Sequence, residues 1–213
     1  MNIRRVIPIA LALGAAASTS TAAVINFDGL AGGPVFGGEL VTSQYSGLGV
    51  TFSDTYGGGA HANNTLTGFI AGSSAPNVLW VDQGSGSYTG HYLEIDFSIP
   101  VQNVSTVFGT SVSADITLAA YNGASLLGSV NTVGGNNSGS VLSGVVGFDT
   151  AQNITSVHLF SHSLGTGASF NFDIDNFTIN AVPEPGVMAL FGLSLTCLGA
   201  WKHSRRARLL QAG

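Results

Sequence analysis

The sequence predicts an all-β domain between residues 24 and 180, an antiparallel two-sheet β-sandwich that is jelly-roll-like. Apolar and polar residues in this stretch alternate with a period of two rather than 3.6. Clusters of Gly, Asn, Ser and Thr interrupt the alternation roughly every ten residues. The chain also has 30 glycines among 213 residues, about twice the usual share. About ten short strands separated by turns fit two packed sheets.

The stretch from Tyr92 to Ile99 shows the strand pattern most clearly. Its odd positions, from Leu93 to Ile99, are apolar, and the residues between them are polar, which is typical of a strand with one buried face. The other expected strands are 24–28, 49–53, 78–82, 104–109, 115–121, 125–132, 141–148, 154–161 and 168–180. Asn122-Gly123 predicts a type I′ hairpin between two of them.

The last expected strand changes phase in its middle. Its apolar residues are at 170, 172 and 174, and then at 177 and 179. A β-bulge at Asp175-Asn176 would produce this change. The bulge would bring Asp173, Asp175 and Asn176 near irregular backbone with free carbonyl groups, which is oxygen-rich chemistry suited to Ca²⁺.

Charge is distributed unevenly along the chain. Between Val24 and Asn180 there are ten Asp and Glu residues and no Lys or Arg, so this segment has a formal charge of −10. Recognition of nucleic acids and phosphates depends on Lys and Arg. The composition therefore excludes nucleic acid as a partner of this domain.

The first 23 residues have the layout of a secretory signal peptide. Arg4 and Arg5 precede an apolar run over residues 6–17, and Thr21 and Ala23 occupy the positions that signal peptidase reads. We expect signal peptidase to cut after Ala23 and the rest of the chain to be exported.

The other end predicts a single transmembrane helix. Residues 187–201 are apolar, and a helix of this length spans about 22 Å, so it needs local membrane thinning or snorkelling to cross. The basic residues that follow, which set the topology, are Lys202, Arg205, Arg206 and Arg208. They would stay cytoplasmic and leave the acidic domain outside. The only cysteine, Cys197, is in this run, so residues 24–180 have no disulfide and no thiol nucleophile.

The ordered set of Pro183-Glu184-Pro185, an apolar segment and an arginine cluster resembles the PEP-CTERM sorting signal, over residues 182–208. The resemblance implies a Gram-negative bacterium and an exosortase as partner. It also implies a transient stay in the inner membrane and cleavage near Pro183, Glu184 and Pro185. The cleaved protein would then be released or attached at the cell surface. The domains expected are thus residues 1–23, 24–180 and 181–213.

Three short motifs in the middle segment, at 25–29, 49–52 and 174–177, are similar to those of β-sandwich ectodomains on PEP-CTERM proteins. Those ectodomains in turn look like jelly-roll carbohydrate-binding modules. In such modules the first and last strands often share a structural calcium, which implies Asp28 and Asp175 as ligands, with Asp173 beside them. Calcium is therefore the one candidate cofactor.

Aromatic residues near polar loops suggest a sugar-binding surface. Tyr56, Tyr88 and Tyr92 lie near loops rich in Gly, Asn and Asp, and stacking rings with polar acceptors is the chemistry that sugar recognition needs. Trp80 also lies near these loops, but its apolar neighbours favour a place in the core.

Glu94 and Asp96 give an enzymatic alternative. On a strand these carboxylates would share one face about 7 Å apart, a separation usable for glycoside hydrolysis. The pair resembles the Glu-x-Asp-x-x-Glu strand of jelly-roll glucanases, but Ile99 stands where that motif has its second glutamate. An exposed polar strand face explains the pair equally well.

The histidines do not predict a metal site. His158 and His162 would share a strand face with Phe160, but about 13 Å apart, too far to bind one ion together. His61 and His91 are isolated in glycine-rich stretches.

The function predicted from the sequence is that of an exported, non-catalytic cell-surface or matrix protein. Its expected role is structural or adhesive, within an exopolysaccharide or biofilm layer. The alternatives are a secreted carbohydrate-binding module and a divergent glycoside hydrolase that uses Glu94 and Asp96.

Overall fold

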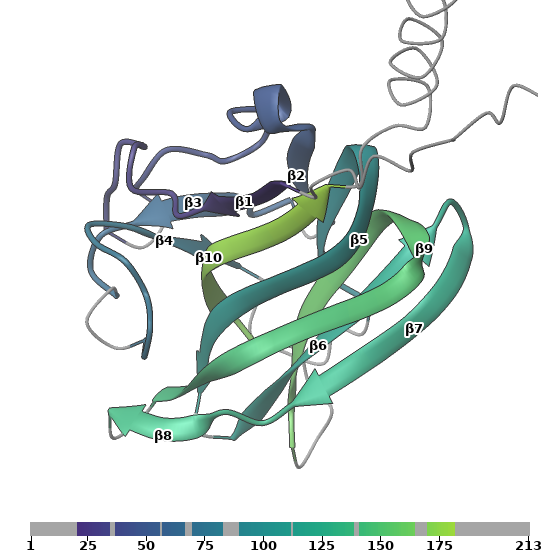
Figure 1. The fold of residues 1–213 in the computed structure, drawn as a ribbon. Helices are drawn as coiled ribbons and strands as arrows, with labels where there is room; N and C mark the ends of the chain where they lie inside the picture. Colours follow the sequence, from purple (N-terminus) through teal and green to yellow (C-terminus); the bar gives the residue numbers. More distant parts are fainter. Residues whose placement is uncertain are drawn as a thin grey trace, which may run out of the picture. The chain divides into compact units, whose positions relative to one another are not determined.

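Two long antiparallel strands, β5 (Leu93–Ser111) and β9 (Val141–Ser163), run side by side through the fold (Figure 1). The computed structural model describes residues 21–34, 37–55, 57–66, 70–82, 90–111, 113–138, 141–164 and 170–181. The register between the two strands shifts between Asp96 and Asn103. On either side of this shift, each strand has different neighbours, so the sheet has two layers.

The first layer holds the N-terminal half of β5 and the C-terminal half of β9. Its other strands are β2 (Val50–Asp54), β6 (Ala114–Asn122) and β7 (Ser125–Thr132). The order across the layer is β2, β5, β9, β6 and β7, with every pair antiparallel. A short 3-10 helix, Ser46–Leu48, precedes β2.

The second layer is built around β10 (Phe172–Ala181), which pairs with the C-terminal half of β5. Its other strands are β1 (Thr21–Ile25), β3 (Ala60–Asn63), β4 (Val78–Val81) and β8 (Gly135–Ser138). The strand β8 extends this layer by pairing with the N-terminal half of β9. The all-β, sandwich-like prediction is confirmed, although the two layers are parts of one continuous hydrogen-bonded sheet.

The core lies between the layers and has an aromatic centre. Phe52 of β2 packs against Phe177 of β10 with ring centroids 6.2 Å apart, and Phe97 of β5 stacks on the same ring at 6.3 Å. Phe27 is fully buried and meets Phe52 edge to face at 5.7 Å. Trp80 is 5% exposed, as predicted for a core residue.

The bulge predicted at Asp175-Asn176 is confirmed. The β10–β5 register shifts between Asp175 and Thr178, and Asn176 has a φ of 48°. The same place marks a change of partner, since β10 pairs with β4 up to Ile174 and with β1 from Phe177 onward. The bulge therefore lies where two strands meet end to end along one edge of β10.

Several strand predictions are wrong in detail. The expected strands 92–99 and 104–109 form one strand, β5, and 141–148 and 154–161 form β9. Pro100 does not end β5, because it lies inside the register shift, where a missing backbone N–H costs no ladder hydrogen bond. The strands β3 and β8 were not predicted from the sequence.

The predicted hairpin exists, but its turn differs from the expected type. The strand pair closes at Asn122 and Ser125, so Gly123 and Ala124 are the central residues. Of these only Gly123 has a positive φ, 57°. This pattern matches a type II′ turn rather than type I′.

The predictions for the chain ends fall mostly outside the described residues. This applies to the signal peptide up to residue 20, to Pro183, Glu184 and Pro185, and to the basic residues from Lys202 on. The strand β1 begins at Thr21, three residues before the expected strand start. Within the described ranges, no helix has the length and apolar character needed to cross a membrane.

Candidate functional site

The outer face of the first layer carries a row of aromatic rings, which we call the aromatic stripe and define as Tyr92, Tyr121, His158, Phe160 and His162. Three of them come from alternate positions of β9, whose intervening residues, such as Val157 and Leu159, are buried in the core. Leu93 pairs with Leu159, so Tyr92 lies next to Phe160 on the same face. The predicted shared face of His158, Phe160 and His162 is confirmed.

His158 lies between two tyrosine rings. The Tyr92 ring stacks on the imidazole with centroids 3.9 Å apart and planes 12° apart. The Tyr121 ring meets the same imidazole at 4.3 Å and 36°. Tyr92 lies next to Phe160, and Tyr121 pairs with Ser156. The two tyrosines are therefore on opposite sides of His158 along β9. The rings hold one another in fixed orientations.

The backbone on either side of Tyr92 is also held. Thr55 Oγ1 donates to the Tyr92 carbonyl at 3.1 Å and accepts from the Tyr92 N–H at 2.9 Å. Burial, followed by the charge of Glu94, raises the pKa of the Tyr92 hydroxyl above its usual value. Tyr92 therefore stays neutral at physiological pH and keeps a hydroxyl group that can donate or accept.

Two carboxylates of β5, Glu94 and Asp96, flank the stripe. Glu94 Oε1 is 3.3 Å from His158 Nε2, and Glu94 is 31% exposed against 16% for His158. Ser53 of β2 donates weakly to Glu94 Oε2 at 3.5 Å. Asp96 is exposed on the same strand face, and partial burial and the charge of Glu94 raise its pKa. Glu94 and Asp96 thus share one face, as predicted.

A further carboxylate, Asp115, lies at the His162 end of the stripe. Asp115 pairs with His162 in the β6–β9 register, and its Oδ1 accepts from the His162 N–H at 3.2 Å. Its Oδ2 accepts from Asn131 Nδ2 at 2.7 Å. The stripe therefore combines ring faces with acidic acceptors along its length.

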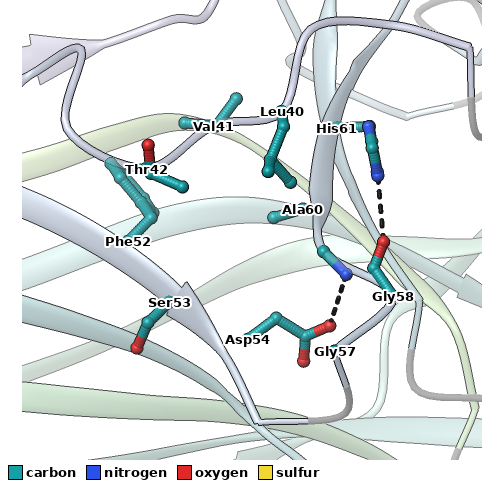
Figure 2. A pocket seen from close by; sticks show the side chains of 11 residues that line it. Leu40, Val41, Thr42, Phe52, Ser53, Asp54, Gly57, Gly58, Ala60 and His61 are labelled. Atoms are coloured by element: carbon teal, nitrogen blue, oxygen red, sulfur yellow. Dashed lines mark hydrogen bonds between the residues drawn. The ribbon is translucent and has the colours of Figure 1, made fainter.

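A small pocket opens beside the stripe, at the edge between β2 and β3. It encloses about 330 Å³, and Phe52, Ser53 and Asp54 form one wall (Figure 2). Asp54 Oδ2 accepts from the Gly59 N–H at 2.9 Å, which closes the loop between the two strands. Both ring nitrogens of His61 face backbone carbonyls, Gly38 O at 3.1 Å and Gly58 O at 2.9 Å. Figure 2 shows that His61 belongs to the wall of the pocket rather than pointing into it as a free ligand.

Two of the three carboxylates predicted to bind calcium, Asp28 and Asp175, accept structural hydrogen bonds, whereas Asp173 Oδ1 is buried without a partner. Asp28 Oδ1 accepts from the Asn77 N–H at 3.0 Å, and the fully buried Asp175 accepts from Ser74 and Asn176. Within the described part of the chain, no group of three or more His, Cys, Asp or Glu side chains is arranged to hold a metal ion. Calcium binding by Asp28, Asp173 and Asp175 stays a prediction.

Of the tyrosines predicted to bind sugar, only Tyr92 can be placed, since Tyr56 and Tyr88 lie outside the described residues. Sequence reasoning missed Tyr121 and the contact between Glu94 and His158. Both arise from pairing between strands distant in sequence. The shared spacing of His158, Phe160 and His162 was the one local signal that pointed to this face.

The described residues thus define a β-sandwich-like domain with a partly exposed row of rings on one sheet face. The chain carries a PEP-CTERM protein-sorting motif at residues 181–206, which confirms the resemblance seen at its C-terminal end. This motif marks an exported protein with a C-terminal sorting signal. Comparison with curated proteins gives no match.

Several solved structures have a similar arrangement of strands at low sequence identity. The K2 cleaved adhesin domain of Lys-gingipain matches with a TM-score of 0.47 and 8% identity, over 76% of this chain and 98% of that chain. The arabinose-bound α-L-arabinofuranosidase MgGH51 gives 0.43 and 12%, over 73% of this chain and 26% of the enzyme. A family 29 carbohydrate-binding module gives 0.41 and 11%, over 76% and 89%. Scores and identities this low carry no evidence about function.

Proposed function

We propose that the protein is an exported, non-catalytic module that binds polysaccharide through the aromatic stripe and has a structural or adhesive role at the cell surface or in an exopolysaccharide matrix. The observation that carries this proposal is the fixed set of rings around His158, with Tyr92 stacked at 3.9 Å and Glu94 at 3.3 Å. Because both tyrosine rings pack on the His158 imidazole, the surfaces offered to pyranose rings are the outer faces of Tyr92 and Tyr121. The neighbouring carboxylates accept hydrogen bonds from hydroxyl groups.

The same geometry favours binding over hydrolysis. Glycoside hydrolysis uses two carboxylates on opposite sides of the scissile bond. Here Glu94 is engaged by His158 and Ser53, and Ile99 stands where the glucanase motif has its second glutamate. Measurable hydrolysis of a polysaccharide by the wild-type protein would favour the alternative of a divergent hydrolase. If Glu94 and Asp96 carried that activity, a Glu94→Gln variant would lose it.

The Tyr92→Ala variant tests the binding proposal. We expect binding of the host's own exopolysaccharide to weaken about tenfold, because one stacking ring and its orienting contact with His158 are lost. Isothermal titration with the full chain in mild detergent measures the effect. The matched control is Val145→Ala, which removes a 62% exposed apolar side chain from β9 in the other layer. Equal affinities of the two variants would contradict the proposal.

We also propose that exosortase processes the chain near Pro183, Glu184 and Pro185 after export across the inner membrane. The strand β10 ends at Ala181, immediately before this motif, so cleavage there removes no residue of the described fold. When the protein is expressed with an exosortase, mass spectrometry should find a mature C-terminus between residues 182 and 186. An intact C-terminus in the secreted protein would contradict processing.

Calcium binding by Asp28, Asp173 and Asp175 is a separate proposal. It rests on the closeness of β1 and β10, whose antiparallel pairing brings the first and last strands together. A bound ion would raise the melting temperature as the Ca²⁺ concentration rises, and EDTA would reverse this shift. A melting temperature that does not respond to either treatment would count against the site.

A further inference from the structure

We infer that the polysaccharide recognised by the aromatic stripe is rich in free amino sugars, that is, hexosamine residues without N-acetyl groups. This inference rests on the proposed function and names the class of sugar that the same site would take. It follows from the charges that surround the stripe together with the arrangement of its rings.

A ligand on the aromatic stripe would meet mainly negative charges. Three carboxylates lie along the stripe: Glu94 near His158, Asp96 at the Tyr121 end and Asp115 at the His162 end. No Lys or Arg occurs anywhere between residues 24 and 180. The side chains of this face that could carry a positive charge are His158 and His162, and only in their protonated forms. His158 is already in contact with Glu94. The face is therefore mainly acidic, with no Lys or Arg to receive an anionic sugar.

These charges would favour some classes of sugar over others. A uronic acid residue placed on the stripe would bring its carboxylate against Glu94 or Asp96, and like charges placed together oppose binding. A neutral sugar would gain stacking and hydrogen bonds only. An amino sugar would gain the same stacking, a charge-assisted hydrogen bond to a carboxylate and attraction of its ammonium group to the tyrosine faces.

A bound cation would also relieve the repulsion between Glu94 and Asp96. Glu94 and Asp96 belong to one face of the same strand, and Asp96 is exposed there. The charge of Glu94 contributes to a raised pKa of Asp96, so the two ionised carboxylates disfavour each other. An ammonium group bound near both would remove this cost. In addition, the formal charge of −10 between residues 24 and 180 would attract a polycation over a longer range.

The test uses three β-1,4-linked hexasaccharides that differ only at C2: the hexamer of glucosamine, the hexamer of N-acetylglucosamine, and cellohexaose. Isothermal titration of the full chain in mild detergent at pH 6 should show at least tenfold tighter binding of the glucosamine hexamer. That advantage should shrink as salt is raised from 50 to 500 mM, roughly the range over which exposed charges become screened.

Equal or tighter binding of cellohexaose or of the acetylated hexamer would overturn the inference and leave the proposed function standing. Binding of none of the three would also overturn it, and the Tyr92→Ala titration with exopolysaccharide would then decide the proposed function separately. The E94Q/D96N double variant should bring the affinity ratio of the amine to the neutral hexamer close to one. An Asp149→Asn control, at an exposed carboxylate elsewhere on β9, should keep the preference.

Discussion

Replacing Asp175 with alanine is expected to lower the free energy of unfolding by about 3 kcal/mol. Asp175 is fully buried at the β10 bulge. Its Oδ2 accepts from both the N–H and the hydroxyl of Ser74, and its Oδ1 accepts from the Asn176 N–H at 2.7 Å. The substitution would leave these donors unpaired in a site closed to water, and buried unpaired donors are costly.

Urea unfolding of the full chain in mild detergent measures this loss. An Asp149→Ala control removes an exposed carboxylate and should change stability by no more than about 0.5 kcal/mol. Hydrogen exchange adds a local readout, because the Ser74 amide should lose protection in the Asp175→Ala variant before the core does. A variant as stable as the control would show that Asp175 does not hold this segment.

Features encoded by neighbouring residues could be predicted from the sequence. The bulge at Asp175-Asn176 follows from a phase change that is visible within ten residues, since a register slip of one residue would otherwise turn buried side chains outward. The outward face of His158 and His162 follows equally from alternation along one strand. Such features depend on the strand period alone.

Features that depend on pairing between distant strands could not be predicted. Glu94 and His158 are 64 positions apart, and they meet because Glu94 is in register with His158 across β5 and β9. Tyr121 reaches the same imidazole only through the separate pairing of β6 with β9. A one-residue change in either register would have moved these side chains to the opposite face, and nothing local excludes such a change.

The missed strands have a related cause. The strand β8 has the sequence GNNS, which lacks the apolar alternation that identifies a strand, and it forms by pairing with β9 at the edge of the second layer. The strand β3 is four residues long and contains His61 and Asn63, which favour a loop assignment. In both cases a neighbouring strand, β4 for β3 and β9 for β8, provides the hydrogen bonds that the local sequence does not predict.

A second large effect is expected at Asp173, where replacement by asparagine should stabilise the protein at neutral and higher pH. Asp173 is in register with Trp80 of β4 and Gly109 of β5. Part of the residue reaches solvent, but its Oδ1 is buried without a hydrogen-bond partner. Burial raises the pKa of this carboxyl well above its ordinary value, because the charged form loses its hydration.

The sign of the pH dependence follows from that raised pKa. In the unfolded chain Asp173 ionises near pH 4, whereas in the folded protein it keeps its proton to a higher pH. Stability should therefore be greatest at acidic pH and should fall as pH rises between the two pKa values, by at most about 1.4 kcal/mol per pH unit. Asparagine does not titrate, so Asp173→Asn would remove this loss while keeping the size of the side chain.

Urea unfolding at pH 4.5 and pH 8 compares the variant with the wild type. The difference should be small at pH 4.5 and should reach about 1–3 kcal/mol in favour of Asp173→Asn at pH 8. The matched control is Asp149→Asn, which neutralises an exposed carboxylate and should show no comparable gain. A calcium ion at Asp173 would reverse the result, because losing a carboxylate ligand would then destabilise the protein when Ca²⁺ is present. Repeating the pH 8 measurement with Ca²⁺ and with EDTA therefore decides whether Asp173 is a buried acid or a metal ligand.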